Sequence, residues 1–518
     1  MAEFLWLKSI LPPLVGGLLI SLLLERLLRP TPGLGNRPLS AWILHLGFWL
    51  AAFAFELTLF QRPYFASSFV LAVWSLLVLV NNAKFSALRE PFVYSDFEYF
   101  TDALRHPRLY IPFLGVGRVI LAVAGFVAAV YVGLTLEAPL SRELAFSALF
   151  IVIASLWVSA ALLIFIGSRT SFEMTFDPAP DLEKFGLVTC LWHYAAAERR
   201  PINLAAYHPI FAATPFAPLK QSSFNNRLPD IVVVQSESFF DVRRVFPHVA
   251  PDIFREWDSL CATAIQQGRL EVAAWGANTV RTEFAFLSGL LNETLGIHRF
   301  NPYRKLALSG IPSFATYAKK LGYRTVCVHP YAASFYNRAT VFPALGFDEF
   351  VDIRQFKEAD RCGPYIGDVA VAEKVKELLG KNDQTDAQPI FIFVITMENH
   401  GPLHWENMTQ DETAPFFTAP LPADCESLAV YVRHLANADK MIGLLRDTLR
   451  ARDQHAYLCW YGDHVPIMPT VYTATSIPDG NTDYLIWQNR DAIAAPLNRL
   501  LNIADLGALL LRQAGLMR

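Results

Sequence analysis

The sequence has little charge for its length, because only 18% of its 518 residues are Asp, Glu, Lys or Arg. It also lacks a basic excess, since 44 Lys and Arg stand against 47 Asp and Glu, and nucleic-acid-binding proteins usually carry such an excess. Glycine and proline, at 27 and 33 residues, are too few for a collagenous or low-complexity chain. These shortages exclude nucleic-acid binding and a disordered or fibrous chain.

Cysteine is also scarce, with six residues and no Cys-x-x-Cys pair or zinc-like Cys/His spacing. This excludes a disulfide-rich miniprotein and a cysteine-based zinc site. We expect Cys327 and Cys459 to pack inside buried strands. Cys362 and Cys425 lie in loop-like segments and are the best candidates for a disulfide.

Hydrophobic residues, in contrast, are abundant: they make up 53% of the chain, whose mean hydropathy is +0.29. Such a composition favours a membrane protein. Runs of about 20 apolar residues can cross a bilayer, and we identify five of them: Leu7–Leu28, Ala41–Phe60, Tyr64–Val80, Pro112–Leu134 and Ala145–Gly167. No such run follows residue 170.

The distribution of these runs predicts three domains: a five-span transmembrane domain over 1–168, an interfacial helix and linker over 169–228, and a globular domain over 229–518. In the middle segment, Asp181–Pro201 fits either an amphipathic helix at the membrane surface or a packing helix of the globular domain. Ala212–Leu228, with its Pro and Asn residues, fits a linker.

Ionisable residues within predicted spans are candidates for function. His45 and Arg118 would lie near the same side of the membrane, where together they form a candidate site for a lipid phosphate. Snorkelling of Arg118 to the interface is the alternative.

The globular domain alternates short apolar runs with helical patterns. The expected strands are Ile231–Val234, Thr325–Val328, Ile390–Ile395 and Ala456–Trp460, and the expected helices are Pro312–Leu321, Asp368–Leu379, Leu428–Arg450 and Leu497–Gln513. Strands that are apolar on both faces and separated by helices indicate an α/β fold around a mostly parallel sheet. Ligands bind at the carboxyl ends of such strands.

Polar residues follow all four expected strands. Glu237 follows the first, His329 the second, Glu398–His400 the third, and Asp463-His464 the fourth. Two carboxylates and an imidazole, from Glu237, Asp463 and His464, suit a divalent ion such as Mn²⁺ or Zn²⁺. Taken singly, each of these residues also fits a helix cap or a turn.

A metal with an open coordination position needs a nucleophile, and Thr279 in Gly-Ala-Asn-Thr-Val-Arg-Thr-Glu-Phe fits this role. A hydroxyl next to a divalent ion loses its proton more easily and can attack phosphorus. The alternative is that Thr279 only caps a helix, with Thr282 and Glu283 in its first turn.

These motifs resemble the alkaline phosphatase/sulfatase superfamily, and specifically its membrane branch of lipoteichoic acid synthase-like phosphoglycerol transferases. The resemblance covers nearly the whole chain. It rests on Glu237 in Ser-Glu-Ser-Phe, Thr279 in Asn-Thr-Val-Arg-Thr-Glu-Phe, Arg338 in Phe-Tyr-Asn-Arg, His400 in Asn-His-Gly-Pro, and Asp463-His464 in Tyr-Gly-Asp-His-Val-Pro.

The resemblance implies a role for each matched residue. One divalent ion, for which we favour Mn²⁺ over Zn²⁺ or Mg²⁺, is held by Glu237, Thr279, Asp463 and His464, and Thr279 is also the nucleophile. The substrate contacts implied are Arg338 and His400, with Tyr336 and Asn399 beside them. Tyr336 stands where the lipoteichoic acid synthases have Trp, so the contact to glycerol there differs.

The resemblance further implies transfer of phosphoglycerol from phosphatidylglycerol to a cell-envelope glycan or polyglycerolphosphate acceptor, through a glycerophosphoryl-threonine. A phosphoethanolamine transferase or a phosphodiesterase with the same metal site is the alternative. Phosphoethanolamine transferases resemble Ser-Leu-Pro-Cys near the nucleophile, where this chain has Thr-Glu-Phe-Ala-Phe-Leu-Ser-Gly. The difference favours phosphoglycerol. A catalytically inactive homologue is a third reading, but it gives no reason to keep Thr279 with all three ligands.

By the same resemblance we expect a multi-pass protein of the bacterial inner membrane with its catalytic domain on the extracytoplasmic side. The distribution of Lys and Arg opposes this orientation, with three such residues in the cytoplasmic segments against seven in the external loops. We follow the resemblance, because phosphatidylglycerol processing needs no nucleotide and external Arg residues can serve an anionic lipid.

Overall fold

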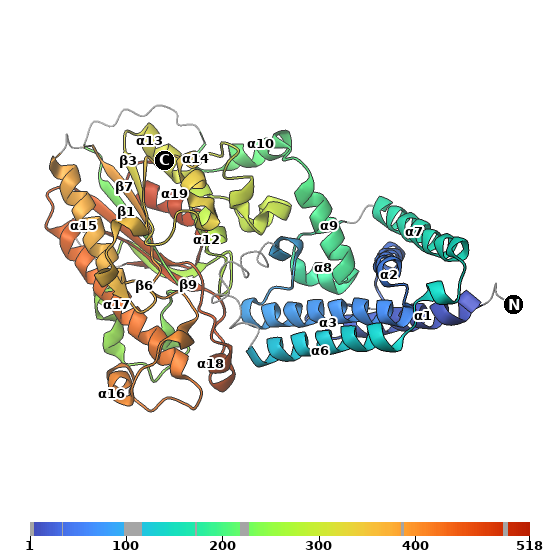
Figure 1. Ribbon diagram of the computed structural model, residues 1–518. Helices are drawn as coiled ribbons and strands as arrows, with labels where there is room; N and C mark the ends of the chain where they lie inside the picture. The colour runs from blue at the N-terminus through green and yellow to red at the C-terminus, as the bar shows by residue number, and fades with distance from the viewer. Residues whose placement is uncertain are drawn as a thin grey trace. The chain divides into compact units, whose positions relative to one another are not determined.

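The computed structural model describes residues 5–33, 35–97, 116–170, 173–217, 227–384, 388–490 and 496–517. The chain divides into two compact units, Met1–Pro201 and Ile202–Arg518, which Figure 1 shows in blue to green and in green to red. The long apolar helices belong to the first unit and the sheet belongs to the second.

The first unit contains long apolar helices: α1 (Leu5–Glu25), α2 (Leu39–Phe60), α3 (Pro63–Leu88), α6 (Val116–Leu136) and α7 (Phe146–Arg169). Among the described residues, five helical stretches are long and apolar enough to cross a membrane. They match the five predicted runs, although residues 112–115 of the fourth run lie outside the described residues. Only 11% of the α7 span is buried, so its apolar surface suits lipid. The protein is a multi-pass membrane protein.

Polar side chains join α1 to α3. The Asn81 amide donates to the Arg29 carbonyl at 2.9 Å, and the Asn82 amide donates to the Leu27 carbonyl at 2.7 Å. These bonds satisfy carbonyl groups beyond the end of α1, which a helix terminus otherwise leaves unpaired. They also explain why α3 continues past Val80, where the apolar run ends.

The segment Asp181–Pro201 forms two helices, α8 (Pro178–Phe185) and α9 (Leu187–Arg199), on either side of Gly186. Gly186 has φ +79°, and a Cβ at this position would lie 2.7 Å from the Arg37 guanidinium, so only glycine fits. Leu182 and Leu187 are buried with apolar residues of α1 and α3. This segment therefore packs on helices of the first unit.

The second unit is built on one mixed sheet. Its described strands are β1 (Asp230–Ser236), β2 (Gln266–Glu271), β3 (Arg324–Val328), β4 (Glu349–Val351), β7 (Ile390–Ile395), β8 (Ala456–Gly462), β9 (Thr482–Gln488), β10 (Leu497–Asn498) and β11 (Leu501–Asn502). They are ordered β10-β2-β9-β8-β1-β7-β3-β4, with β11 beside β2. The strands from β8 to β4 are parallel, while β9 is antiparallel to both β8 and β2. The predicted α/β fold with a mostly parallel sheet is confirmed.

Helices connect and cover these strands (Figure 1). They are α10 (Leu204–Ala213), α11 (Arg255–Cys261), α12 (Thr279–Ser288), α13 (Phe314–Lys320), α14 (Arg338–Ala344), α15 (Asp368–Gln384), α16 (Gln410–Thr413), α17 (Glu426–Arg450), α18 (Pro469–Ala474) and α19 (Ile503–Gln513). Of the predicted linker, residues 218–226 lie outside the described residues.

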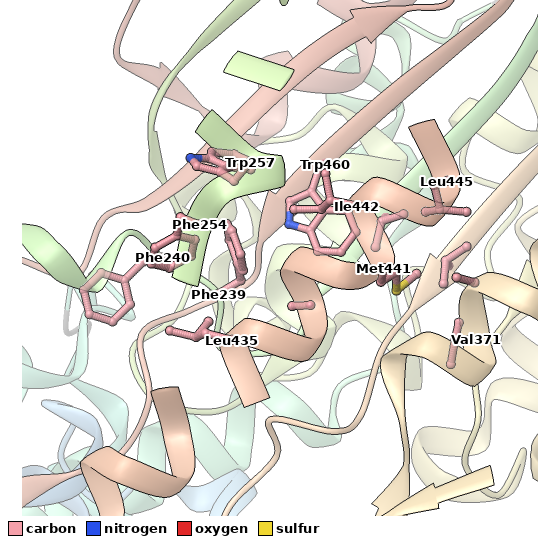
Figure 2. Packing of buried hydrophobic residues seen from close by; sticks show 14 of the residues in the cluster. Phe239, Phe240, Phe254, Trp257, Val371, Leu435, Met441, Ile442, Leu445 and Trp460 are labelled. Carbon is pink, nitrogen blue, oxygen red and sulfur yellow. The ribbon is translucent and has the colours of Figure 1, made fainter. Parts of the chain in front are cut away.

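The sheet is buried on both faces. Val232 and Val234 of β1 belong to one core cluster, and Ile231 and Val233 belong to the other, as expected when successive side chains point to opposite faces. Figure 2 shows part of the first cluster, in which Trp460 of β8 lies among Phe239 and residues of α17. The two faces therefore hold the strand ends in fixed positions.

A short hairpin, β5 (Arg361–Cys362) with β6 (Tyr365–Ile366), lies outside the main sheet. The predicted disulfide between Cys362 and Cys425 is wrong, since both residues are free thiols. The Cys362 thiol instead lies near the Glu398 carboxylate, and burial with this carboxylate raises the pKa of Cys362 to about 12.

Candidate metal centre and active site

The carboxyl ends of β1 and β8 bring the predicted metal ligands together. These neighbouring parallel strands pair Ser236 with Gly462, so the next residues, Glu237 and Asp463, lie side by side. One ligand atom from each of Glu237, Asp463 and His464 lies within 4.8 Å of the others. His464 Nε2 is 3.3 Å from Asp463 Oδ2 and 3.5 Å from Glu237 Oε1.

The charges in this cluster are unbalanced. Glu237 and Asp463 are both buried, and within the described part of the chain Asp463 Oδ2 has no hydrogen-bond partner. Burial, together with the neighbouring Asp463 charge, raises the pKa of Glu237 to about 8. Two buried carboxylates with an unsatisfied oxygen suit a divalent cation, because its charge would offset both.

Ser238 orders this cluster, and in the sequence only its place after Glu237 distinguishes it. Its N–H donates to Asp463 Oδ1 at 2.8 Å, and its hydroxyl donates to Glu237 Oε1 at 3.0 Å. The Nδ1 of His464 is 3.1 Å from the Val465 carbonyl, so donation from Nδ1 leaves Nε2 free for a metal. Gly462 permits the tight turn, since a Cβ there would lie 1.8 Å from the Phe239 carbonyl oxygen.

Thr279 is the first residue of α12, and Asn278 occupies the capping position without a side-chain capping bond. Thr279 therefore does not cap the helix. The other candidate hydroxyl, on Thr282, is fully buried and donates to the Asp463 carbonyl at 2.9 Å. This bond joins the first turn of α12 to the loop that carries Asp463 and His464. Because the Thr282 hydroxyl already holds this loop, Thr279 remains the candidate nucleophile.

Arg338 begins α14 and is 1% exposed. Its Nη2 donates to Glu283 Oε2 at 3.0 Å, and its Nη1 is 3.2 Å from His329 Nε2. His329 Nδ1 is 3.2 Å from the Ile395 carbonyl, and burial holds the pKa of His329 well below its usual value. A neutral His329 therefore accepts a hydrogen bond from Arg338. Tyr336 lies 5.3 Å from the guanidinium, measured to the ring centroid.

His400 and Asn399 follow β7. The Tyr365 hydroxyl lies 3.2 Å from His400 Nδ1, which is itself 2.7 Å from the Gly401 carbonyl. Burial lowers the pKa of His400, so the ring is neutral near pH 7. Asn399 is 3% exposed, and among the described residues neither of its amide atoms has a partner. Buried amides are usually hydrogen-bonded, so Asn399 is a candidate to contact a ligand.

The backbone beside the candidate site residues is strained. Ser238, Asn278, Tyr336 and Asn337 adopt left-handed conformations with φ of 53°, 65°, 53° and 54°. Each directly precedes or follows Glu237, Thr279 or Arg338, apart from Tyr336, which is one residue further away. Left-handed non-glycine residues cost about 1–3 kcal/mol each and cluster at functional sites. The strained residues therefore lie in the same region as the buried charges of Glu237 and Arg338.

Comparisons with known proteins identify the family of the globular domain. A model of the sulfatase family matches residues 229–516. The capsular polysaccharide biosynthesis protein RkpI of Rhizobium meliloti is 27% identical over 454 residues, covering 82% of this chain and 77% of that protein. A putative cyclic β-1,2-glucan modification protein of the same organism is 30% identical over 273 residues, covering 52% of this chain and 40% of that protein.

A solved structure shares the whole architecture. The integral membrane lipooligosaccharide phosphoethanolamine transferase A of Neisseria meningitidis is similar with a TM-score of 0.51, at 14% identity, over 92% of this chain and 95% of that one. At this identity the likeness shows the fold alone. Together with the family match, which spans more than half of the residues, it establishes that the chain belongs to the sulfatase family.

Proposed function

We propose that the protein is a membrane-bound phosphoglycerol transferase, which moves the headgroup of phosphatidylglycerol to an acceptor hydroxyl through a glycerophosphoryl-threonine at Thr279. One observation carries this proposal. The 2.9 Å bond from Thr282 to the Asp463 carbonyl attaches the first turn of α12 to the loop of Asp463 and His464, and residues three apart share a helix face. This attachment supports the Thr279 hydroxyl as the nucleophile.

Glu237, Asp463 and His464 lie close enough together to hold one divalent ion, and we propose that the Thr279 hydroxyl joins them. Nitrogen and oxygen donors together favour Mn²⁺ or Zn²⁺ over the harder Mg²⁺, and we propose Mn²⁺. A bound ion would lower the pKa of the Thr279 hydroxyl and offset charge on the phosphoryl oxygens.

The reaction has two displacements. In the first, the Thr279 oxygen forms a bond to phosphorus, the bond from phosphorus to the diacylglycerol oxygen breaks, and diacylglycerol leaves with a proton. In the second, the oxygen of an acceptor hydroxyl forms a bond to the same phosphorus, the bond from phosphorus to the Thr279 oxygen breaks, and the proton lost by the acceptor returns to Thr279. Arg338, His400, Asn399 and Tyr336 are the proposed contacts to the phosphoglycerol group. The Arg338 guanidinium offsets phosphoryl charge, and the unpartnered Asn399 amide is available to the glycerol hydroxyls.

The nature of the acceptor is supported by the curated relatives. One is named for capsular polysaccharide biosynthesis and the other for modification of a cyclic β-1,2-glucan. A cell-envelope glycan, or a growing polyglycerolphosphate chain, is therefore our proposed acceptor. We place the globular domain, 229–518, on the extracytoplasmic side of the bacterial inner membrane, and an activity reporter fused after Arg518 would test this side.

The experiment that tests the function uses the purified full-length protein in detergent with Mn²⁺. It is offered phosphatidylglycerol and phosphatidylethanolamine, each labelled in the headgroup, and diacylglycerol release is followed. We expect release from phosphatidylglycerol and a glycerophosphoryl adduct on Thr279 by mass spectrometry. Release from phosphatidylethanolamine alone would instead support the alternative, a phosphoethanolamine transferase, and an adduct on Thr282 would overturn our choice of nucleophile.

A further inference from the structure

Glu283 is a fully buried carboxylate for which the reaction above has no use. It lies on α12, one turn after Thr279, and accepts hydrogen bonds from three other segments. Arg338 donates to it through Nη2 at 3.0 Å and through Nε at 3.4 Å. The Tyr303 hydroxyl also donates to it, as does the Gln235 amide at 3.4 Å. A buried carboxylate with this many donors is fully determined in position.

The network continues to the strands that carry the metal ligands. Gln235 accepts a hydrogen bond of 2.7 Å from the Tyr461 hydroxyl. Gln235 stands two residues before Glu237 on β1, and Tyr461 stands two residues before Asp463 on β8. Glu283 is therefore connected to the nucleophile helix, to both ligand-bearing strands and to Arg338.

The contacts of Arg338 show what Glu283 accomplishes. A guanidinium has five N–H donors. Glu283 accepts hydrogen bonds from the Nε–H and from one N–H of Nη2, and His329 accepts one from Nη1. Among the described residues, one N–H on each Nη nitrogen has no acceptor, and two such N–H groups suit two oxygens of a phosphoryl group. Moreover, Arg338 follows two left-handed residues, Tyr336 and Asn337, so a strong tertiary contact is needed to hold this turn.

We propose that Glu283 is a positioning residue, which holds Arg338 at the end of its strained turn and fixes the guanidinium relative to the Thr279 helix. The inference rests on the proposed function only in that Arg338 must contact the transferred group. Glu283 itself touches neither metal nor substrate. A misplacement of about 1 Å in such a group costs on the order of 100-fold in rate.

A double-mutant cycle tests this role. Diacylglycerol release from phosphatidylglycerol is measured for Glu283→Gln, Arg338→Gln and the double variant, all full-length and loaded with Mn²⁺. If Glu283 acts through Arg338, each single change lowers kcat/KM by about 100-fold and the double variant is no slower than Arg338→Gln. We expect the loss mainly in kcat. Losses that multiply would overturn the inference and leave the proposed function intact, whereas an unaffected Arg338→Gln would overturn both.

Loss of folding is separated from loss of positioning by a matched control. Asp230 pairs with Arg452 at 2.7 Å, and both side chains are at most 9% exposed, but Asp230 begins β1 and so lies at the opposite end of that strand from Glu237. Asp230→Asn should lower Tm as Glu283→Gln does, yet keep kcat/KM within about twofold of wild type. Mn²⁺ affinity should change little in either variant. Equal losses of activity in the two variants would show that Glu283 is only structural.

Discussion

Each unit of this protein has a cluster of buried ionisable groups, and the two clusters differ in charge balance. In the membrane unit, Glu25 accepts a hydrogen bond of 2.5 Å from Arg37 and lies 3.5 Å from His45. His45 is also 2.9 Å from the Ser21 hydroxyl. One carboxylate and one guanidinium balance each other there. In the catalytic unit, Glu237 and Asp463 lie beside the imidazole of His464, and among the described residues neither carboxylate forms an ion pair with Lys or Arg.

The difference separates a structural cluster from a functional one. Burying a charge is costly unless it is paired, and the pair of Glu25 and Arg37 meets this condition inside the protein. The pair of Glu237 and Asp463 has no such partner inside the protein, and meets the condition when a cation binds or when Glu237 takes up a proton. His45 contacts Ser21 and Glu25 within the helix bundle. The lipid phosphate site predicted for His45 with Arg118 stays a prediction, because the Arg118 side chain lies outside the described residues. Unbalanced burial, rather than burial itself, identifies the site.

The largest effect on activity is expected when Thr279, the proposed nucleophile, is replaced. Thr279→Ala removes a hydroxyl at the start of α12 without breaking a bond on which the fold depends. Diacylglycerol release should therefore fall by about 10⁴-fold or more, a barrier increase of about 5.5 kcal/mol, while Tm stays near that of wild type. Headgroup release and thermal unfolding of the same preparation provide the check. A variant that retains a tenth of the activity would contradict the assignment.

Core substitutions usually destabilise a protein, but removal of one carboxylate from the catalytic cluster should stabilise it when no metal is bound. Asp463→Asn removes one of the two facing carboxylates, so in chelator the variant should be more stable than wild type. In Mn²⁺ the order should invert, because the affinity for the ion falls by about 100-fold. Thermal unfolding with and without Mn²⁺ measures both effects. Equal destabilisation in both conditions would mean that Asp463 is structural.

The strand ends that carry this cluster were predictable from the sequence because parallel strands meet at one edge of a sheet. An apolar run followed by Glu237 and another followed by Asp463-His464 suffice, since β1 and β8 then need only be neighbours. Partners far apart along the chain were not predictable. Glu283 and Arg338 are 55 residues apart, and neither periodicity nor composition encodes that pairing.

Elements with weak patterns were missed for a related reason. The strands β2 and β9 are absent from the predicted set, and their antiparallel pairing depends on contacts between Gln266–Leu270 and Thr482–Ile486. The disulfide prediction failed because a loop location says nothing about distance. In the structure Cys362 lies near Glu398, a partner that only the folded chain provides.

The balanced cluster should respond in the opposite way to the catalytic one. Glu25→Gln leaves Arg37 buried without its carboxylate, and breaking a buried pair costs about 3 kcal/mol or more. The variant should therefore unfold at a lower temperature than wild type both in chelator and in Mn²⁺. Its Mn²⁺ affinity should be unchanged. The same two unfolding curves and an Mn²⁺ titration give the answer, and a dependence of the Glu25→Gln effect on Mn²⁺ would contradict the separation of the clusters.

The smallest effect is the pH dependence of stability that Glu237 gives to the catalytic cluster. Burial and Asp463 raise the pKa of Glu237 to about 8 from 4.5, so between these values the folded metal-free protein binds more protons than the unfolded chain. Its stability in chelator should therefore decrease as the pH rises from about 5 to 8. Mn²⁺ affinity should increase over the same range, because the ion competes with the Glu237 proton. Tm in chelator, measured in steps of pH for wild type and Glu237→Gln, tests the sign: the slope should be shallower in the variant, and an identical slope would assign the pH dependence to other groups.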